Sequence, residues 1–315
     1  MVETFAGPTC GVAAHNRSAA GRPKADYAAG VAKELRRALH AAYAAWDADD
    51  FETAADALAR VVRLPGGDHR QYWFDLALAH KFRRDWPAAR QAGLAAVERG
   101  VDADGDPTWW NLGIAATALR DWALARRAWQ GFGIELEPGD GPIEQDLGLT
   151  PVRIEGRESP EVVWAQRLCP ARARVVSVPL PSSGRHWGEV VLHDGVPNGT
   201  REWQGRQCPV FDEIELFEPS GTPTSTVRLD AAADDVEALL DRFVHAGWGV
   251  EEMADVRVLC KSCSEGHIDP SHTHERGEPG RVLIAAPPEE IASTLAAWRS
   301  IDPAGRHHGA VERML

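Results

Sequence analysis

The amino-acid sequence predicts an α+β protein of several domains: a helical hairpin array, then a small antiparallel β module, then an α/β sandwich. Three observations predict this order. The segment Trp73–Ala89 is repeated as Trp109–Ala125, 36 residues further along the chain. The hydrophobic period then changes from about 3.6 residues to two after Pro138–Pro142. From residue 224 onward, strand patterns alternate with helix patterns.

The repeated segment predicts a stack of helical hairpins over residues 25–138. A third copy lies upstream, because Asp50-Phe51 precedes Asp85-Trp86 by 35 residues. Repeats of this period form hairpins that bury their apolar faces only against neighbours, and the end of the array needs a cap. The array continues directly into more chain, which we expect to supply that cap. The aligned positions are Trp73 with Trp109, Leu76 with Leu112, Ala77 with Gly113, and Trp86 with Trp122.

These residues resemble the tetratricopeptide repeat over residues 35–137. The sequence departs from the repeat at His80 and Ala116, where Tyr is usual, and at Gly93, where an aromatic residue is usual. The resemblance implies an interaction scaffold that binds a protein or a peptide. The remaining chain resembles C-terminal extensions of uncharacterised bacterial proteins with such repeats, and this implies no function. The matching residues are Trp73, Leu76, Ala77, Ala89 and Ala96, and again Trp109, Leu112, Gly113, Ala125, Trp129 and Phe132.

The resemblance also implies which residues form the inner, partner-binding face of the array. Aromatic residues gathered on an exposed face are typical of binding interfaces. An alternative stays open, in which the C-terminal half of the chain or its N-terminus fills the same groove. The implied residues are Arg36, Leu39, Tyr43 and Trp46, then Gln71, Phe74, Leu78, Lys81 and Phe82, then Trp110, Ile114 and Thr117.

The rest of the chain divides into two β-containing modules and two ends. Residues 143–219 contain short strands between turn residues, including a strand at Gly188–Leu192 followed by turns at Asp194-Gly195 and Asn198-Gly199. They predict an antiparallel sheet or a partly open barrel. Residues 224–303 follow a β-α-β-loop-β-α order, which is that of a ferredoxin-like sandwich. Residues 304–315 supply its last strand or form a free tail, and residues 1–24 lack periodicity and are expected to be disordered.

A Cys/His-rich loop at residues 260–274 predicts a zinc site. Two thiols at Cys-x-x-Cys spacing place both sulfurs on one side of a turn, and histidines from the same loop complete a tetrahedral set. Thiolate with imidazole favours zinc over magnesium or calcium. A polar loop without metal is the alternative, and a redox pair fits less well because the motif follows a strand. The candidate ligands are Cys260, Cys263, His267, and either His272 or His274.

Composition excludes several classes of protein. The net charge of −13 disfavours sequence-independent binding to nucleic acid and to anionic membrane surfaces. Five cysteines form no disulfide framework, and the sequence has neither a long apolar run nor a signal-peptide pattern. These features predict a cytoplasmic protein, and its twelve Trp residues with heavy use of Ala, Arg and Gly indicate a bacterial source.

The sequence therefore predicts an adaptor that binds a protein or peptide partner and carries a structural zinc site. It contains no P-loop, nucleophile elbow or dinucleotide fingerprint, so no catalytic or cofactor-binding residue is assigned. Two alternatives stay open. One is a metal-dependent enzyme or metal-handling protein that uses the Cys/His loop as an open site, and the other is an immunity-type inhibitor of a basic toxin.

Overall fold

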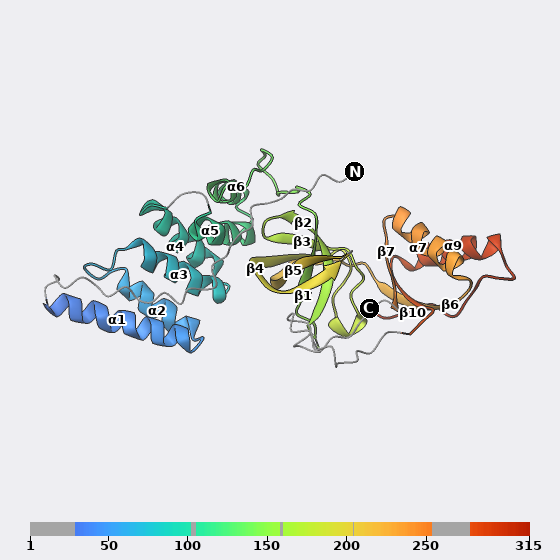
Figure 1. The fold of residues 1–315 in the computed structure, drawn as a ribbon, viewed down its shortest axis with the longest axis horizontal. Coiled ribbons are helices and arrows are strands. Elements are labelled where there is room, and N and C mark those ends of the chain that lie inside the picture. Colours follow the sequence, from blue (N-terminus) through green and yellow to red (C-terminus); the bar gives the residue numbers. More distant parts are fainter. Residues whose placement is uncertain (1–28, 102–104, 158–159, 204, 254–277) are drawn as a thin grey trace. The chain divides into compact units, whose positions relative to one another are not determined.

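The structure is a computed structural model of the 315-residue chain, and it describes residues 29–101, 105–157, 160–203, 205–253 and 278–315. Helices come first and two β-sheets follow, which confirms the predicted α+β class (Figure 1). The chain forms two compact units, Met1–Leu112 and Gly113–Leu315. The predicted disorder of residues 1–24 and the predicted zinc ligands lie outside the described residues.

The N-terminal helices pair into three consecutive hairpins. The first two hairpins share a core of small and branched apolar residues, among them Ala42, Leu58, Leu76 and Ala92. The hairpins pair α1 (Ala29–Asp47) with α2 (Phe51–Val61), α3 (Arg70–Phe82) with α4 (Trp86–Glu98), and α5 (Pro107–Ala118) with α6 (Trp122–Gly131).

The same turn closes each of the three hairpins. A residue with φ of 57° lies two positions after the end of the first helix, at Asp49, Arg84 and Arg120. The aspartate that follows caps the second helix by accepting a hydrogen bond from a backbone N–H three residues later, which satisfies a donor that the helix leaves unpaired. These capping residues are Asp50, Asp85 and Asp121.

Glycines allow close helix packing in the second and third hairpins. A Cβ atom placed on Gly113 would lie 2.7 Å from the ring of Trp129, which is fully buried. A Cβ atom on Gly93 would lie 3.2 Å from the side chain of Leu112. The small residues of the repeat therefore set how closely these helices approach.

Residues 149–218 form a closed five-stranded barrel. Neighbouring strands are antiparallel except β1 and β5, which pair in parallel with Val152 opposite Phe211. This parallel pair closes the sheet fully, and it departs from the purely antiparallel module that the sequence predicts. The strands are β1 (Leu149–Ile154), β2 (Glu161–Cys169), β3 (Arg172–Val175), β4 (Val190–Trp203) and β5 (Arg206–Glu218).

The turns predicted at Asp194-Gly195 and Asn198-Gly199 are wrong. Strand β4 runs through both positions and pairs with β5 along its length. Four shifts in register interrupt that pairing, including one between His193 and Pro197 and one between Pro197 and Thr200. The turn-forming residues are therefore accommodated as irregularities inside one long hairpin.

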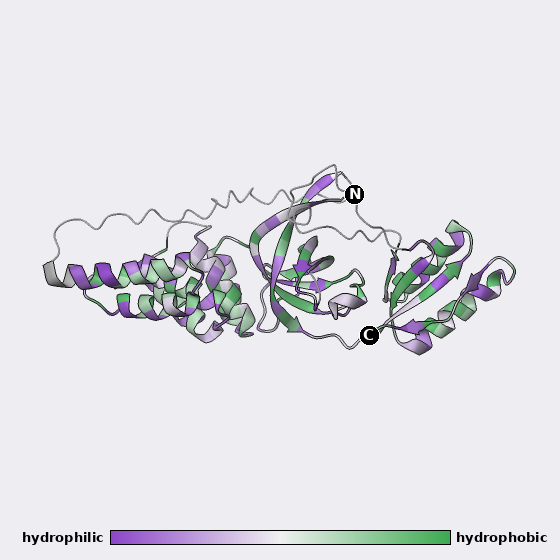
Figure 2. Ribbon diagram, turned by 90° about the horizontal axis from the view of Figure 1, so that it is seen from below, coloured by the Kyte–Doolittle hydropathy of each residue, from purple (hydrophilic) through white to green (hydrophobic). Residues whose placement is uncertain are grey.

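The C-terminal module has a sheet in the order β10-β6-β8-β7, with every neighbouring pair antiparallel. Helices α7 and α9 bury apolar residues against it, including Phe243 and Trp298. Figure 2 shows hydrophobic residues along much of its strands. The last residues of the chain pair with β6 through two short strands. The elements are β6 (Thr224–Asp230), α7 (Ala233–His245), β7 (Gly249–Glu252), β8 (Arg281–Ala285), α9 (Pro288–Ile301), β9 (His307–His308) and β10 (Glu312–Arg313).

Candidate functional site

Three aromatic side chains form a partly exposed patch at the turn ends of the first two hairpins. Trp46 lies in the last turn of α1, Phe51 opens α2 and Phe82 ends α3. The ring centroids lie 5.5 Å apart for Trp46 and Phe51, 5.8 Å for Trp46 and Phe82, and 4.6 Å for Phe51 and Phe82. Phe82 remains 40% exposed. We call Trp46, Phe51 and Phe82 the aromatic patch.

A polar contact joins α1 to α3. The Tyr43 hydroxyl donates to Asp75 Oδ2 at 2.6 Å, and Gln71 Nε2 donates to Asp75 Oδ1 at 2.9 Å. Burial raises the pKa of Asp75, although both hydrogen bonds oppose the change. Burial, followed by the neighbouring Asp75 carboxylate, raises the pKa of Tyr43. The predicted residues Tyr43 and Gln71 thus hold one buried acceptor between them.

A second polar contact joins α3 to α5. Lys81 is 6% exposed, and its Nζ donates to Asn111 Oδ1 at 2.9 Å. The same ammonium group lies 5.7 Å from the ring centre of Phe82. Most of the Lys81 side chain is therefore inaccessible to a partner. Its ammonium group makes a cation–π contact with Phe82 of the aromatic patch.

The other predicted face residues differ in how much surface they present. Arg36 is exposed, and Phe74, Leu78 and Trp110 are half-buried. Ile114 is fully buried, as is Thr117, so neither offers a surface for the partner contact that the resemblance implies. The composition of α5 explains this burial. The stretch Leu112–Ala118 carries apolar or small residues on every side of the helix, and a helix of that kind is buried on all sides.

The predicted metal ligands Cys260, Cys263, His267, His272 and His274 lie outside the described residues. Within the part of the chain that the structure describes, no group of three or more His, Cys, Asp or Glu side chains could hold a metal ion. The two cysteines described there are both free, Cys169 buried and Cys208 half-buried. The zinc site stays a prediction.

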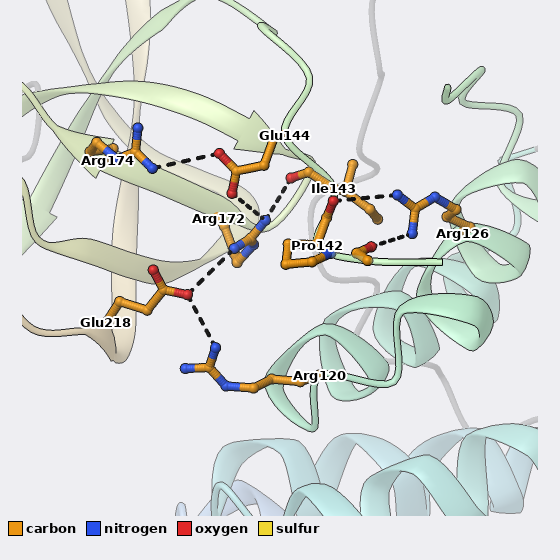
Figure 3. Close-up of polar contacts among 9 residues, drawn as sticks. Arg120, Arg126, Pro142, Ile143, Glu144, Arg172, Arg174 and Glu218 are labelled. Carbon is orange, nitrogen blue, oxygen red and sulfur yellow. Dashed lines mark hydrogen bonds and ion pairs between the residues drawn. The ribbon is translucent and has the colours of Figure 1, made fainter. Parts of the chain in front are cut away.

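A cluster of arginines around the buried Arg172, which sequence reasoning missed, lies where α6 and the segment after it meet the barrel (Figure 3). The side chain of Arg172 in β3 is fully buried. Its guanidinium carbon lies 4.8 Å from the ring centre of Trp122 in α6 and 5.2 Å from that of Phe217 in β5. Arg172 also donates to the Ile143 carbonyl at 2.6 Å, and it lies 3.9 Å from Glu218.

Two further arginines strengthen this contact from the helical side (Figure 3). Arg120 donates to Glu218 at 3.1 Å and to the Phe217 carbonyl at 3.0 Å. Arg126 donates to the Gly141 carbonyl at 2.6 Å. The alternation of side chains along a strand could not predict that Arg172 is buried. Alternation places Arg172 and Arg174 on the same face of β3, although only Arg172 is buried.

The barrel also encloses His193, which the sequence assigns no role. It is fully buried, its ring centre lies 5.3 Å from that of Phe211, and its Nδ1 lies 2.9 Å from the Asp194 carbonyl. Burial, followed by the nearby positive charge of Arg167, lowers its pKa to about 4. His193 is therefore neutral at physiological pH, as expected for a core residue.

The resemblance to the tetratricopeptide repeat rests on the residues of the repeats alone, because comparison with known proteins adds no match. No helix among the described residues is long and apolar enough to cross a membrane. Comparing the chain with protein-family models and with curated proteins finds no match in either set.

Proposed function

We propose that this protein is an adaptor whose hairpins are tetratricopeptide repeats and whose aromatic patch binds a protein or peptide partner. The observation that carries the proposal is the exposure of Phe82, which is 40% accessible within a cluster of three aromatic rings. Aromatic side chains gathered at a surface supply much of the binding free energy at protein interfaces. The repeated turns and N-caps of the hairpins support the repeat assignment.

Two side chains beside the patch are already fixed in place. Asp75 holds Tyr43 by a hydrogen bond between α1 and α3, and Asn111 holds Lys81 between α3 and α5. A surface carried by helices that such hydrogen bonds already hold together loses less conformational entropy when a partner arrives. The hairpins thus present a preorganised surface, which suits a scaffold for a peptide or a folded partner.

The C-terminal module is proposed to be a ferredoxin-like sandwich with a structural zinc site. The strand order β10-β6-β8-β7, with antiparallel neighbours and two helices, supports the first part. Strands β7 and β8 pair with Glu252 opposite Val282, and Cys260 and Cys263 lie between these two strands in the sequence. A zinc ion bound there would stabilise a polar loop that has little apolar area to bury.

The aromatic patch can be tested with the variant Phe82→Ala. We expect capture of partner proteins from an extract of the source cell to fall about ten-fold or more, because an anchoring aromatic side chain is lost. The melting temperature should change little, since the ring is partly solvated already. Quantitative mass spectrometry of the captured proteins measures the effect.

Ile301→Ala provides the matched control, because Ile301 in α9 is 58% exposed and also apolar. This variant should retain the wild-type partners. Retention of the same partners by Phe82→Ala, or an equal loss in both variants, would contradict the proposal.

A further inference from the structure

The first hairpin contains a hollow of about 430 Å³ between α1 and α2. We call it the basic hollow, because three of its lining side chains are cationic and one is anionic. The lining residues are Lys33, Glu34, Arg37, Ala38 and Ala41 of α1 and Arg60 of α2.

The spacing of residues along α1 explains the hollow. Ala38 and Ala41 are three residues apart and share one side of the helix, where their short side chains leave space beside α2. Lys33 and Arg37 are four residues apart and project along the same stretch. Their long side chains, with that of Arg60, form the rim, and all three are exposed.

The cations of the basic hollow lack partners in the part of the chain that the structure describes. No ion pair or side-chain hydrogen bond there engages Lys33, Arg37 or Arg60, and the single carboxylate, Glu34, balances only one of them. Figure 2 shows hydrophilic residues along much of α1. Unpaired cations around a hollow attract anionic groups, and here they do so on a chain whose net charge is −13.

We propose that the basic hollow binds the carboxylate side chains of an acidic segment in the partner. This inference rests on the proposed adaptor function and adds the chemistry of the partner. Short acidic peptides interact mainly with local charge, because exposed charges beyond about 8 Å are largely screened at physiological salt. A long nucleic acid would instead meet the acidic surface of the whole chain, which disfavours it.

The test uses the full-length protein and a fluorescein-labelled decapeptide of alternating Glu and Ala, followed by fluorescence anisotropy. We expect the double variant Arg37→Ala/Arg60→Ala to bind the peptide about ten-fold more weakly than the wild type, and the wild-type affinity to fall as salt is raised. Alanine suits the helices, so both hairpin helices should remain folded.

The control is Arg242→Ala/Arg299→Ala, which removes the same charge from exposed positions of α7 and α9. It should bind within about two-fold of the wild type, since neither position lines the basic hollow. Equal loss in both double variants would overturn the inference. So would binding of a Lys/Ala decapeptide as tightly as the Glu/Ala peptide, or tighter binding of a ten-nucleotide single-stranded RNA.

The two proposals fail in different ways. If Phe82→Ala loses the partner while Arg37→Ala/Arg60→Ala retains both partner and peptide, only the acidic-segment inference is wrong. If the peptide binds as expected but Phe82→Ala retains every partner, the role of the aromatic patch is wrong.

Discussion

Glu161, near the start of β2, shows how one buried carboxyl group can make stability depend on pH. Both of its carboxylate oxygens accept a hydrogen bond from the backbone N–H of Leu180, each at 3.1 Å. Burial nevertheless raises its pKa to about 7, and the carboxylate of Glu251 acts in the same direction. His193 is the opposite case, because burial keeps it neutral by lowering its pKa to about 4.

We predict that Glu161 lowers the free energy of unfolding by up to about 3 kcal/mol as pH rises from about 5 to about 8, while His193, with its lowered pKa, acts in the opposite direction below about pH 6.5. The folded state holds a proton on Glu161 in this range and the unfolded state has released it, so raising the pH favours unfolding. Glu161→Gln should remove this contribution, because an amide does not titrate, so the free energy of unfolding of the variant should rise relative to that of the wild type as pH increases. Urea unfolding at several pH values measures it, and an unchanged slope in the variant would contradict the assignment.

At the scale of elements, the helical hairpins are defined by a repeated turn and by small residues at helix contacts. The position of Gly113 is occupied by Ala77 in the preceding repeat, where a Cβ atom is accommodated. In the third hairpin, Trp129 fills that space and leaves no room, since a Cβ atom would lie 2.7 Å from its ring. The identity of this one residue therefore follows from the size of its neighbour.

Gly113→Ala is expected to destabilise the protein by about 1–3 kcal/mol, because the fully buried ring of Trp129 must shift. This cost exceeds the gain of up to about 1 kcal/mol that alanine brings to a helix. Gly141→Ala is the control, because no atom lies within 4 Å of its added Cβ. Thermal unfolding of both variants measures the difference. Equal melting temperatures would contradict the prediction, because they would show that the space beside Trp129 accommodates a methyl group at residue 113.

At the scale of the whole molecule, the chain caps its own helical repeats. In the first hairpin, Phe51 opens α2 and contacts Phe82 of the next hairpin. The equivalent residue of the third hairpin is Trp122, which has no following repeat. It contacts Phe217 at 6.2 Å and Arg172 instead, both from the barrel. The barrel thus supplies the contact that another repeat would have made.

The zinc hypothesis gives a prediction at the same scale. We expect one zinc ion per chain, lost in Cys260→Ser and in Cys263→Ser, with affinity that falls as pH drops because protons compete for thiolate and imidazole. Chelation should leave the helical circular dichroism of the hairpins largely intact, since they have a separate core. Elemental analysis measures the metal, with Cys208→Ser as the control. Protein purified without chelator that contains no zinc would end the hypothesis.

The sequence by itself determined the helical hairpins, their caps and most of the strands. These features depend on local spacing: apolar period, an aspartate before each second helix, and small residues at fixed offsets. The β-α-β order of the C-terminal module was readable for the same reason. Candidate residues such as Tyr43, Trp46 and Phe82 could also be found, because repeat positions carry over from one hairpin to the next.

Only the tertiary structure decided which of those residues are accessible and how distant segments meet. Ile114 is buried although its repeat position implies exposure, because burial depends on what packs against a helix from elsewhere. The parallel pairing of β1 with β5, and the burial of Arg172 between Trp122 and Phe217, join residues far apart in the chain. The basic hollow likewise needs Arg60 of α2 beside Lys33 and Arg37 of α1, and no local pattern specifies that meeting.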